Sequence, residues 1–507
     1  MRFSELLADL SLRGLSPQRL TPTSLDPELS EITQDSREVP RGSLFVAISG
    51  MRMDAHEFIP GVAESGAAAA FVEREVPIPG GVAAAQFKDG RLALAYAAAS
   101  LQGHPSEEMT IVGITGTDGK STTSVLTVDA LLACGVPAGG MNSLDFRVLE
   151  RIEQNESYMT TLESPVIQAR LRDLVNAGVK TAVLEVTSHG LALHRVDAIA
   201  FDIAAYTNLT HEHLDFHGTI DAYREAKLQL AELARQSPRK PGVPKAIVYN
   251  ADEPAWEALA TAPTDRRVTY GLERPADVFG ANVRARIDGI GFTARTRDGE
   301  LEVSLPITGR FNVYNALCAL ACCRAMGLPL DRAAQGLARA RGLRGRMQVL
   351  NAGQPFAIVI DFAHTPDGLE KVLGELRPLT RGRLFTVFGA PGDRDVTKRP
   401  LMGEAVGRLA DEFVITTDDP RHESAADISA AIASGAEKAG RRQGQDYRVI
   451  IDRREAIREV LARARPGDTV LLAGKGHEDR MLIGDDTLPW DEAAEARAAL
   501  SALGVPG

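Results

Sequence analysis

The sequence predicts an α/β protein built from three domains, and three observations support this. The chain has 507 residues, which is enough for roughly three domains of ordinary size. Two long segments alternate short apolar runs with helical stretches, a pattern typical of parallel β-sheets. A segment between them alternates apolar and polar residues, as antiparallel strands do. We place the domains at residues 1–107, 108–344 and 345–507.

Residues 1–107 predict a small N-terminal α/β domain. Strand-like runs such as SLFVAI and AAAAFV are separated by turns. The amphipathic start, MRFSELLADLSLRG, lacks the apolar run and the cleavage site of a signal peptide. No window of the chain has the apolar length of a membrane span. We therefore expect a cytoplasmic protein.

Residues 108–344 predict a central domain with a P-loop-type parallel sheet. The strand TIVGIT, which starts at residue 110, enters a glycine-rich turn, and TAVLEVT, FDIAAYTNLT and KAIVYN follow with helices between them. Residues 277–306 alternate with period two around Asp288–Gly289 and Asp298–Gly299. This pattern indicates antiparallel hairpins, which we expect to form a satellite sheet.

Residues 345–507 predict a C-terminal Rossmann-like α/β domain. A helix starting near Asn312 leads to the basic, glycine-rich stretch RGLRGRMQ. After it, FAIVIDF, RLFTVFG, DEFVITT, YRVII and DTVLLAG recur with helices between them. The third domain therefore begins near Gly345.

The net charge argues against a nucleic-acid-binding protein, and the spacing of the cysteines argues against a CxxC metal site. The formal net charge is −11, so the overall field repels nucleic acid, and any phosphate site must be built locally. The four cysteines (Cys134, Cys318, Cys322 and Cys323) form no pair of CxxC half-sites. We interpret them as reduced core residues.

The segment GITGTDGKSTTSV, residues 113–125, has the composition of a phosphate-binding loop. Its glycines allow backbone N–H groups to approach phosphate oxygens, Lys120 supplies a charge to the β- and γ-phosphates, and the Ser121 hydroxyl is able to ligate Mg²⁺. The general motif requires glycine where this chain has Ile114, so the loop is a variant. The simpler alternative is a plain strand-to-helix turn.

Acidic and imidazole side chains follow two of the predicted central strands, where ligands bind in open α/β sheets. They are Glu185, His189, His211, His213, Asp215 and His217. Glu185 and His213 are candidates for a second Mg²⁺, although this cation prefers oxygen ligands. Lys227 lies in a helical run, YREAKLQLAELA, where a solvated lysine is the ordinary expectation.

The order of motifs along the whole chain resembles the Mur ligase superfamily. Within it, the resemblance is to the tripeptide synthetases, which add the third amino acid to UDP-N-acetylmuramoyl-dipeptide. The motifs are DSR (35–37), TGTDGKSTT (115–123), TTLES (160–164), EVTSHGLALHR (185–195), TNLTHEHLDFHG (207–218), GRFNVYNAL (309–317), GRMQ (345–348), DFAHTPDGL (361–369), GDRD (392–395), DDPR (418–421) and GKGHE (474–478).

The resemblance implies a role for individual residues. Lys120, Glu185, His213 and Lys227 are implied to be catalytic. Metal binding is implied for Ser121, Glu185, His213 and Lys227, the last as a carbamate formed with CO₂. Residues implied to bind the UDP-muramoyl dipeptide are Ser36, Thr160, Thr161, Thr187 and Arg195. Those implied to bind ATP are Gly116, Thr117, Asp118, Gly119, Lys120, Ser121, Thr122, Asn315, Arg346, Asp361 and His364. Those implied to surround the incoming amino acid are Arg394, Asp418, Asp419, Pro420, Arg421, Gly474 and Glu478.

The implied reaction joins an amine to a carboxylate at the expense of ATP. The γ-phosphoryl group activates the D-glutamyl carboxylate as an acyl phosphate, which the amine of the next amino acid attacks. The implied cofactor is Mg²⁺, with two ions expected, and ATP is a cosubstrate. The expected partners are these small molecules, without nucleic acid or a membrane span, and we expect a monomer. The third domain is expected to close and exclude water from the acyl phosphate.

Two departures from the family pattern bear on the function. Asp118 stands where the family usually has asparagine, which puts a carboxylate near phosphates. Asp419 makes the motif at residues 418–421 DDPR, whereas the resemblance associates DNPR with enzymes that add meso-diaminopimelate. Arg421 is retained and suits the distal carboxylate of diaminopimelate, which we favour slightly, while Asp419 suits the distal amine of L-lysine or L-ornithine.

Two other functions remain open from the sequence. A folylpolyglutamate-synthase-like ligase shares the phosphate loop and the general layout. A noncatalytic nucleotide-binding scaffold is the alternative from a different class, although the chain retains Lys120, Glu185, His213, Lys227 and Glu478. A cyanophycin synthetase would need a further ATP-binding domain.

Overall fold

The computed structural model describes residues 1–21, 24–50, 53–157, 159–210 and 212–505. The chain forms two compact units. The first comprises Met1–Phe279 and Tyr314–Gly336, and the second comprises Gly280–Val313 and Leu337–Gly507. The first unit is therefore discontinuous, because the chain leaves it after Phe279 and returns at Tyr314. The division into three domains at residues 107 and 344 remains a prediction.

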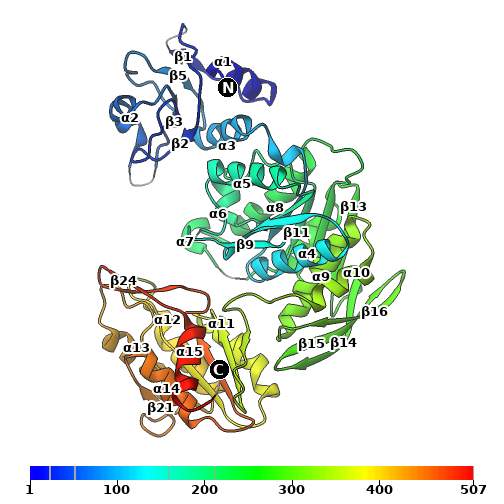
Figure 1. The fold of residues 1–507 in the computed structure, drawn as a ribbon, viewed down its shortest axis with the longest axis vertical. Coiled ribbons are helices and arrows are strands. Elements are labelled where there is room, and N and C mark those ends of the chain that lie inside the picture. Colours follow the sequence, from blue (N-terminus) through cyan, green and yellow to red (C-terminus); the bar gives the residue numbers. More distant parts are fainter. Residues whose placement is uncertain (22–23, 51–52, 158, 211, 506–507) are drawn as a thin grey trace. The chain divides into compact units, whose positions relative to one another are not determined.

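The start of the first unit is a small sheet covered on both faces. Its strand order is β1-β5-β4-β3-β2, and only β1 runs antiparallel to its neighbour. The strands are β1 (Arg19–Thr21), β2 (Ile32–Thr33), β3 (Leu44–Val46), β4 (Ala69–Val72) and β5 (Ala83–Gln86). Helices α1 (Phe3–Leu12) and α3 (Gly90–Leu101) pack on one face and α2 (Ile59–Ser65) on the other (Figure 1). The predicted small α/β domain is confirmed.

The rest of the first unit is built around a mainly parallel sheet. Strands β7-β10-β6-β11-β12-β13 lie side by side in parallel, β8 pairs antiparallel with β7, and β9 pairs antiparallel with β8. They are β6 (Thr110–Thr115), β7 (Ala138–Met141), β8 (Asp145–Val148), β9 (Arg151–Gln154), β10 (Thr181–Glu185), β11 (Ile203–Tyr206), β12 (Ala246–Asn250) and β13 (Arg266–Gly271). Neighbours β10, β6 and β11 end at the same edge, so the polar residues after them share one end of the sheet.

Helices cover this sheet and supply its core. They are α4 (Lys120–Ala133), α5 (Ser164–Asn176), α6 (Ser188–Ala192), α7 (Leu214–His217), α8 (Ile220–Gln236), α9 (Arg310–Ala325) and α10 (Leu330–Ala338). Apolar residues at helical spacing, such as Ile167, Leu171 and Leu174 of α5, are buried against the strands. Short 3-10 helices are η1 (Ala55–Phe58), η2 (Pro105–Glu107), η3 (Pro254–Ala260) and η4 (Arg377–Leu379).

The period-two segment forms the predicted hairpins. Strand β14 (Val278–Arg286) starts beside β13 in parallel, through Val278 and Phe279, and then continues into the second unit. Strands β15 (Gly289–Thr296) and β16 (Gly299–Leu305) pair antiparallel. The turns at Asp288–Gly289 and Asp298–Gly299 separate these strands as predicted. The following helix starts at Arg310, two residues before the predicted position.

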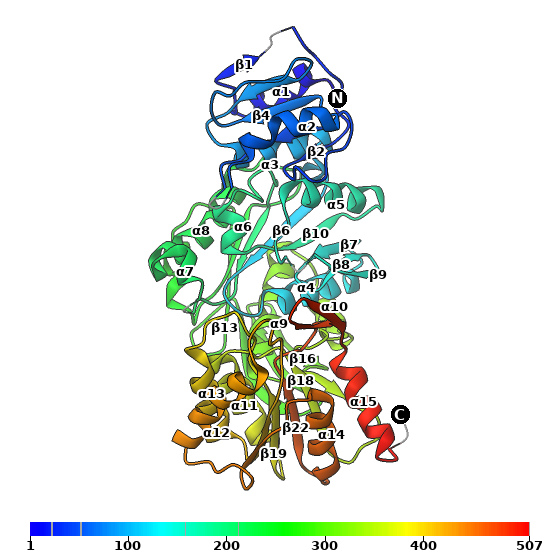
Figure 2. The ribbon, with the colours of Figure 1, turned by 90° about the vertical axis from the view of Figure 1, so that its left-hand side faces the viewer.

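The second unit has a sheet with helices on both faces. Its order is β17-β18-β22-β19-β20-β21, parallel except for β17. The strands are β17 (Gln348–Leu350), β18 (Ala357–Asp361), β19 (Leu384–Phe388), β20 (Glu412–Ile415), β21 (Tyr447–Val449) and β22 (Thr469–Ala473), with a separate hairpin of β23 (Arg480–Ile483) and β24 (Asp486–Pro489). Helices α11 (Pro366–Leu376), α12 (Lys398–Leu409) and α13 (Ala425–Lys438) cover one face, and α14 (Arg453–Arg463) and α15 (Glu492–Ala502) cover the other (Figure 2). The predicted Rossmann-like architecture is confirmed.

The structure describes the burial of the cysteines and the apolar character of the helices. Cys318, Cys322 and Cys323 are buried, Cys134 is half-buried, and all four are free thiols. Among the described residues, none of the helices combines the length and the apolar character needed to span a bilayer.

Candidate active site

The phosphate loop joins β6 to α4 and requires glycine at two positions. Gly116 has φ +143°, and a Cβ there would lie 1.8 Å from the Oγ1 atom of Thr207. Gly119 has φ +78°, and a Cβ there would lie 2.3 Å from the Oδ1 atom of Asn315. Both the backbone conformation and the close packing therefore exclude a side chain. The predicted ATP residue Asn315 lies against the loop, although it comes from α9.

The polar groups of the loop are held in place by the strand ends around it. Lys120 Nζ donates to the carbonyl oxygen of Thr117 at 2.7 Å, so the ammonium group lies over the loop. The amide of Asp118 donates to Asn208 Oδ1 at 2.8 Å. The half-buried Thr122 lies in the first turn of α4. Amides of the loop and the start of a helix near a lysine form a typical environment for phosphate oxygens.

Oxygen ligands converge beside the loop at Glu185, the last residue of β10. Glu185 Oε2 accepts from Ser121 Oγ at 2.8 Å and from the hydroxyl and amide of Ser143, each at 2.9 Å. Glu185 is only 4% exposed, and its charge acts on the buried Lys227. A buried carboxylate surrounded by hydroxyl groups fits Mg²⁺, which takes oxygen ligands. The residues present therefore fit the metal that the resemblance implied.

Lys227 of α8 is buried rather than solvated. Its side chain is 1% exposed, Nζ donates to the carbonyl oxygen of Gly116 at 2.7 Å, and Nζ lies 4.5 Å from the centre of the Tyr223 ring. Burial, and then the positive charge of Lys120, lower the pKa of Lys227 well below its ordinary value. This lysine therefore tends to be a neutral amine, which is the form that reacts with CO₂.

His213 lies among aromatic rings close to these groups. Its ring centre is 4.8 Å from that of His189 and 6.0 Å from that of Tyr223, the ring that also contacts Lys227. The His213 backbone is left-handed, with φ +55°. His211 lies outside the described residues, as does the side chain of Asp215. The structure thus brings His213 and Lys227 to the same tyrosine.

Four of the five predicted dipeptide-binding residues, Thr160, Thr161, Thr187 and Arg195, are linked by hydrogen bonds around Glu185 and Ser143. Thr161 Oγ1 donates to the carbonyl oxygen of Glu185 at 3.2 Å and accepts from the amide of Thr187 at 2.9 Å. Arg195 donates to the carbonyl oxygen of Thr161 at 3.0 Å, and Thr160 donates to Ser143 at 3.2 Å. The fifth residue, Ser36, is half-buried in the turn after β2.

In the second unit, the end of β18 holds the predicted ATP residues. Asp361 is 6% exposed and accepts from the amides of Met347 and Ala363, each at 2.8 Å. Burial raises the pKa of Asp361. The Arg346 guanidinium lies 4.7 Å from the centre of the Phe362 ring, and His364 Nδ1 is 2.8 Å from the Phe362 carbonyl oxygen. Arg346, Asp361 and His364 are therefore brought together.

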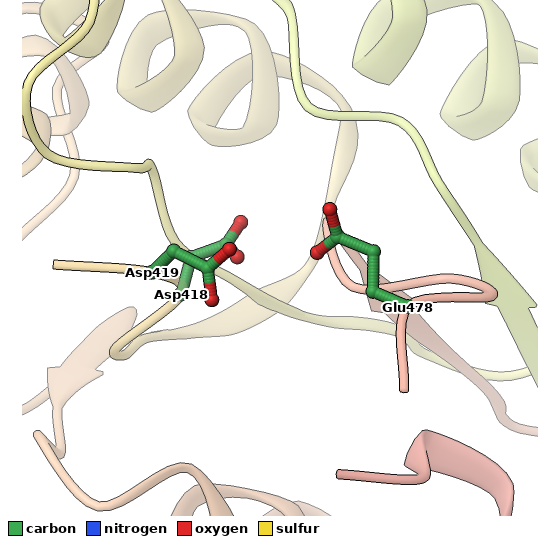
Figure 3. Close-up of side chains that lie close together, drawn as sticks. All are labelled: Asp418, Asp419 and Glu478. Atoms are coloured by element: carbon green, nitrogen blue, oxygen red, sulfur yellow. The ribbon is translucent and has the colours of Figure 1, made fainter. Parts of the chain in front are cut away.

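The loops after β20 and β22 bring three carboxylates together. Asp418 and Asp419 lie on the first loop and Glu478 on the second, with oxygens of all three within 4.8 Å of one another (Figure 3). Lys475 Nζ contacts Asp419 and Glu478, each at 2.7 Å, and Asp418 at 3.8 Å. Burial raises the pKa of Glu478 to about 7. The cluster carries more negative than positive charge even with Lys475 present.

The other predicted amino-acid-binding residues lie on or near these loops. Arg421 Nε is buried without a hydrogen-bond partner, and among the described residues the Arg421 side chain has no ion pair. Pro420 is buried, and Gly474 has φ +105° with the space for a Cβ limited by Asp418 Oδ2 at 2.8 Å. Arg394 is exposed on the loop after β19. The structure therefore brings Gly474 close to Asp418, places Arg421 two residues after Asp419 on the same loop, and leaves Arg394 at the surface.

The sequence interpretation missed Lys475, Ser143 and Tyr223. Lys475 lies inside the motif GKGHE, three residues before Glu478, so its charge near an acidic residue was a signal in the sequence. Ser143 follows β7 and Tyr223 precedes Lys227 by one helical turn, but neither type of residue alone indicates a site.

Models of three protein families match the chain. They are "Mur ligase family, catalytic domain" over residues 28–109, "Mur ligase middle domain" over residues 114–323, and "Mur ligase, glutamate ligase domain" over residues 345–476.

Similar proteins match nearly the full length. A UDP-N-acetylmuramyl-tripeptide synthetase of Roseiflexus sp. (strain RS-1) is 46% identical over 521 residues, 100% of both chains. A UDP-N-acetylmuramoyl-L-alanyl-D-glutamate–2,6-diaminopimelate ligase of Bacillus licheniformis is 40% identical and covers 94% of this chain and 96% of its own. A solved structure of a protein with that same name superposes with a TM-score of 0.69 at 30% identity, over 96% of this chain and 98% of that one.

The parallel sheet, the glycine-rich loop and the oxygen atoms beside it form a site of the kind that binds a nucleotide with Mg²⁺, and the matches in family and relatives show that the protein is an ATP-dependent ligase. The chain belongs to the Mur ligase family, whose members act in peptidoglycan synthesis.

Proposed function

We propose that the protein adds the third amino acid to UDP-N-acetylmuramoyl-L-alanyl-D-glutamate. The observation that carries this proposal is the acidic cluster of Asp418, Asp419 and Glu478 around Lys475. The loop that carries the two aspartates also carries Arg421, whose side chain has no ion pair with any described residue. Such a site suits an amino acid with charges of both signs. The names of the Roseiflexus and Bacillus relatives support the same activity.

The reaction begins with phosphoryl transfer from ATP to the D-glutamyl carboxylate. Amides of the loop at Gly116–Gly119 and the ammonium group of Lys120 hold the phosphates in place. Mg²⁺, held by Ser121 and Glu185 with His213 and Lys227 as the further ligands implied by the resemblance, supplies charge neutralisation when bound. Thr160, Thr161, Thr187 and Arg195 position the dipeptide, and Ser36 contacts the uridine. The amine of the third amino acid then attacks the acyl phosphate, and phosphate leaves.

Lys227 is proposed to act as a carbamate. Its neutral amine attacks the carbon of CO₂, a new N–C bond forms, and the nitrogen loses a proton, which leaves an anionic carboxylate on the side chain. The low pKa and the position of Nζ at Gly116 support this reaction. A carbamate supplies the hard oxygen ligand that a buried ammonium group does not.

The third amino acid is proposed to be meso-diaminopimelate. The acidic cluster suits the distal ammonium group, and Arg421 suits the distal carboxylate that L-lysine and L-ornithine lack. Asp419 is bound by Lys475 and by the amide of Leu482 at 3.0 Å, so part of its charge is already balanced within the protein. Lysine or ornithine remains the alternative.

The remaining assignments follow the same scheme. Asn315, Arg346, Asp361 and His364 are proposed to bind ATP, and Arg394, Pro420 and Gly474 to line the amino-acid site with the acidic cluster. The three domains at residues 1–107, 108–344 and 345–507 are proposed to bind the UDP moiety, ATP and the amino acid respectively. We also propose that the enzyme is a cytoplasmic monomer.

The test is ADP release by the purified protein with UDP-N-acetylmuramoyl-L-alanyl-D-glutamate, ATP and Mg²⁺. Meso-diaminopimelate, L-lysine and L-ornithine are compared at equal concentrations, and reactions without the dipeptide correct for background hydrolysis. ADP release that depends on one amino acid establishes the ligase and its substrate. Failure with all three, in a preparation that binds ATP, would contradict the proposed reaction and favour a folylpolyglutamate substrate or a noncatalytic role.

A further inference from the structure

A buried ion pair in the second unit has no role in the chemistry described above. Arg453, the first residue of α14, and Glu492, the first residue of α15, have side chains that are 0% exposed. Arg453 Nη2 and Nε contact the two oxygens of Glu492 at 2.6–3.1 Å. The indole N–H of Trp490 also donates to Glu492, at 2.7 Å. The charges are thus fully removed from water and fixed in one orientation.

The remaining donors of Arg453 reach two particular carbonyl groups. Nη2 donates to the carbonyl oxygen of Ala473 at 2.8 Å, and Nη1 donates to that of Thr417 at 3.4 Å. Ala473 immediately precedes Gly474, and Thr417 immediately precedes Asp418. Arg453 therefore joins the starting points of the two loops that carry the acidic cluster, although their strands β20 and β22 are separated by β19.

The same pair also reaches the far end of the second loop. The amide of Trp490 donates to the carbonyl oxygen of Asp479 at 2.8 Å, and Asp479 follows Glu478 directly. The loop from Gly474 to Glu478 is consequently tied at both ends, by Arg453 at one and by Trp490 at the other. Glu492 links the two ties because it accepts hydrogen bonds from both side chains.

Stability alone does not account for this arrangement. Replacing a buried ion pair with apolar residues of similar volume is often neutral or stabilising, because the charges lose their hydration when they are buried. A guanidinium group, however, presents several donors in a rigid planar fork, which suits the joining of separate backbone segments. Asp418 and Glu478, like Glu492, raise the pKa of Arg453 against the opposing effect of burial, so its charge also acts on the cluster.

We propose that Arg453 is a positioning residue for the amino-acid site, and that Glu492 orients its guanidinium group so that both loops are held at a fixed separation. This inference rests on the proposed function only in assigning the loops to the amino acid. It gives Arg453 an effect on the binding of one substrate, without any contact between Arg453 and that substrate.

The experiment compares three proteins with the wild type. The double variant R453M/E492Q removes both charges and keeps an acceptor for the Trp490 indole, and R453K keeps the charge but loses the fork. The control, R383M/D468N, removes an ion pair of 3.2 Å at the opposite ends of β19 and β22. For each, thermal unfolding and the KM values for ATP, dipeptide and amino acid are measured.

We expect the KM for the amino acid to rise about tenfold in R453M/E492Q and by a smaller factor in R453K, with the other KM values within about twofold of wild type. The control should lower stability without changing any KM. Unchanged KM for the amino acid in folded R453K and R453M/E492Q would overturn the proposal. If the double variant does not fold, R453K decides the question alone.

A second readout separates this inference from the proposed reaction. Hydrogen exchange of the amides between Gly474 and Glu478 is measured without any substrate, and it should be faster in R453M/E492Q than in wild type and the control. If the wild type accepts no amino acid but the exchange is faster, the substrate assignment fails while the positioning role stands. Unchanged exchange in the folded variants would contradict the positioning role itself.

Discussion

Lys227 donates from its buried ammonium or amine nitrogen to the carbonyl oxygen of Gly116, at 2.7 Å. This contact places a lysine with a strongly lowered pKa directly under the phosphate loop. A permanently charged lysine at this point would oppose Mg²⁺ binding, whereas a carbamate would assist it. Four predictions test this lysine and other groups of the candidate site.

Lys227→Ala should lower turnover about 100-fold or more, because the site loses an anionic ligand for a metal that stabilises the transferring phosphoryl group. Lys227→Arg, which keeps a positive charge but forms no stable carbamate, should be impaired to a similar extent. ADP release measures the loss, and short carboxylic acids should partly restore Lys227→Ala. Carbon-13 NMR with labelled bicarbonate should show a carbamate signal in wild type alone. Wild-type turnover in either variant would remove the carbamate role.

Gly119→Ala should weaken both folding and nucleotide binding. Its new Cβ meets Asn315 Oδ1 at 2.3 Å, in addition to the strain of φ +78°. Gly135→Ala is the matched control, because Gly135 has φ +80° and open space around the position of a Cβ. We expect Gly135→Ala to cost about 1 kcal/mol and Gly119→Ala clearly more, with ATP binding reduced only in the latter. Urea unfolding and titration with ATP provide the two measurements, and equal effects in both variants would show that the Asn315 contact is unimportant.

Glu185→Gln should raise the Mg²⁺ concentration needed for half-maximal activity about tenfold or more, because a carboxamide carries no charge. The fold should be retained, since the amide oxygen still accepts from Ser121 and Ser143. Glu64→Gln, which removes an exposed carboxylate of α2, controls for the loss of one negative charge. A Mg²⁺ titration of ADP release is the measurement. An unchanged Mg²⁺ requirement in Glu185→Gln would place the metal elsewhere.

Glu478→Gln should make stability less dependent on pH. The folded-state pKa of Glu478 is about 7, above its ordinary value of 4.5, so the folded protein prefers the protonated carboxyl group. Its contribution to stability is therefore complete below about pH 4.5 and is lost as the pH rises through about 7. The variant should match wild type at about pH 4.5 and exceed it by up to about 3 kcal/mol at about pH 8. Urea unfolding at both values checks this, with Glu455→Gln as a control for removing an exposed carboxylate. A constant difference between variant and wild type at the two pH values would contradict the assignment.

Local sequence patterns predicted much of the fold. The period-two run around Asp288 and Asp298 predicted strands and turns that the structure confirms, because alternation of side chains is a local property. The addition of β14 to β13 through Val278 and Phe279 was not predictable in this way, since strand pairing depends on partners distant from the pattern.

For the candidate site too, the parts set by local sequence were predictable and the parts set by long-range packing were not. The phosphate loop and Glu185 each belong to a motif at the end of a predicted strand. Parallel strands end at the same edge of a sheet, so the sequence predicted that the two lie close together. The ion pair of Arg453 and Glu492 could not be predicted from the sequence, because two charged residues at the starts of different helices are ordinarily solvated. Only the packing of both helices on one face of the sheet reveals that neither charge reaches water.

The discontinuity of the first unit has a consequence for how the enzyme is made. A ribosome delivers Met1–Phe279 before Tyr314–Gly336, and between them it delivers a segment that belongs to the second unit. At about 5–20 residues per second, the nascent phosphate loop waits roughly 10–40 seconds for the helix that carries Asn315. During that interval the partly built unit exposes a surface that α9 will later cover, so nascent chains of this length should depend on chaperones more than the finished protein does.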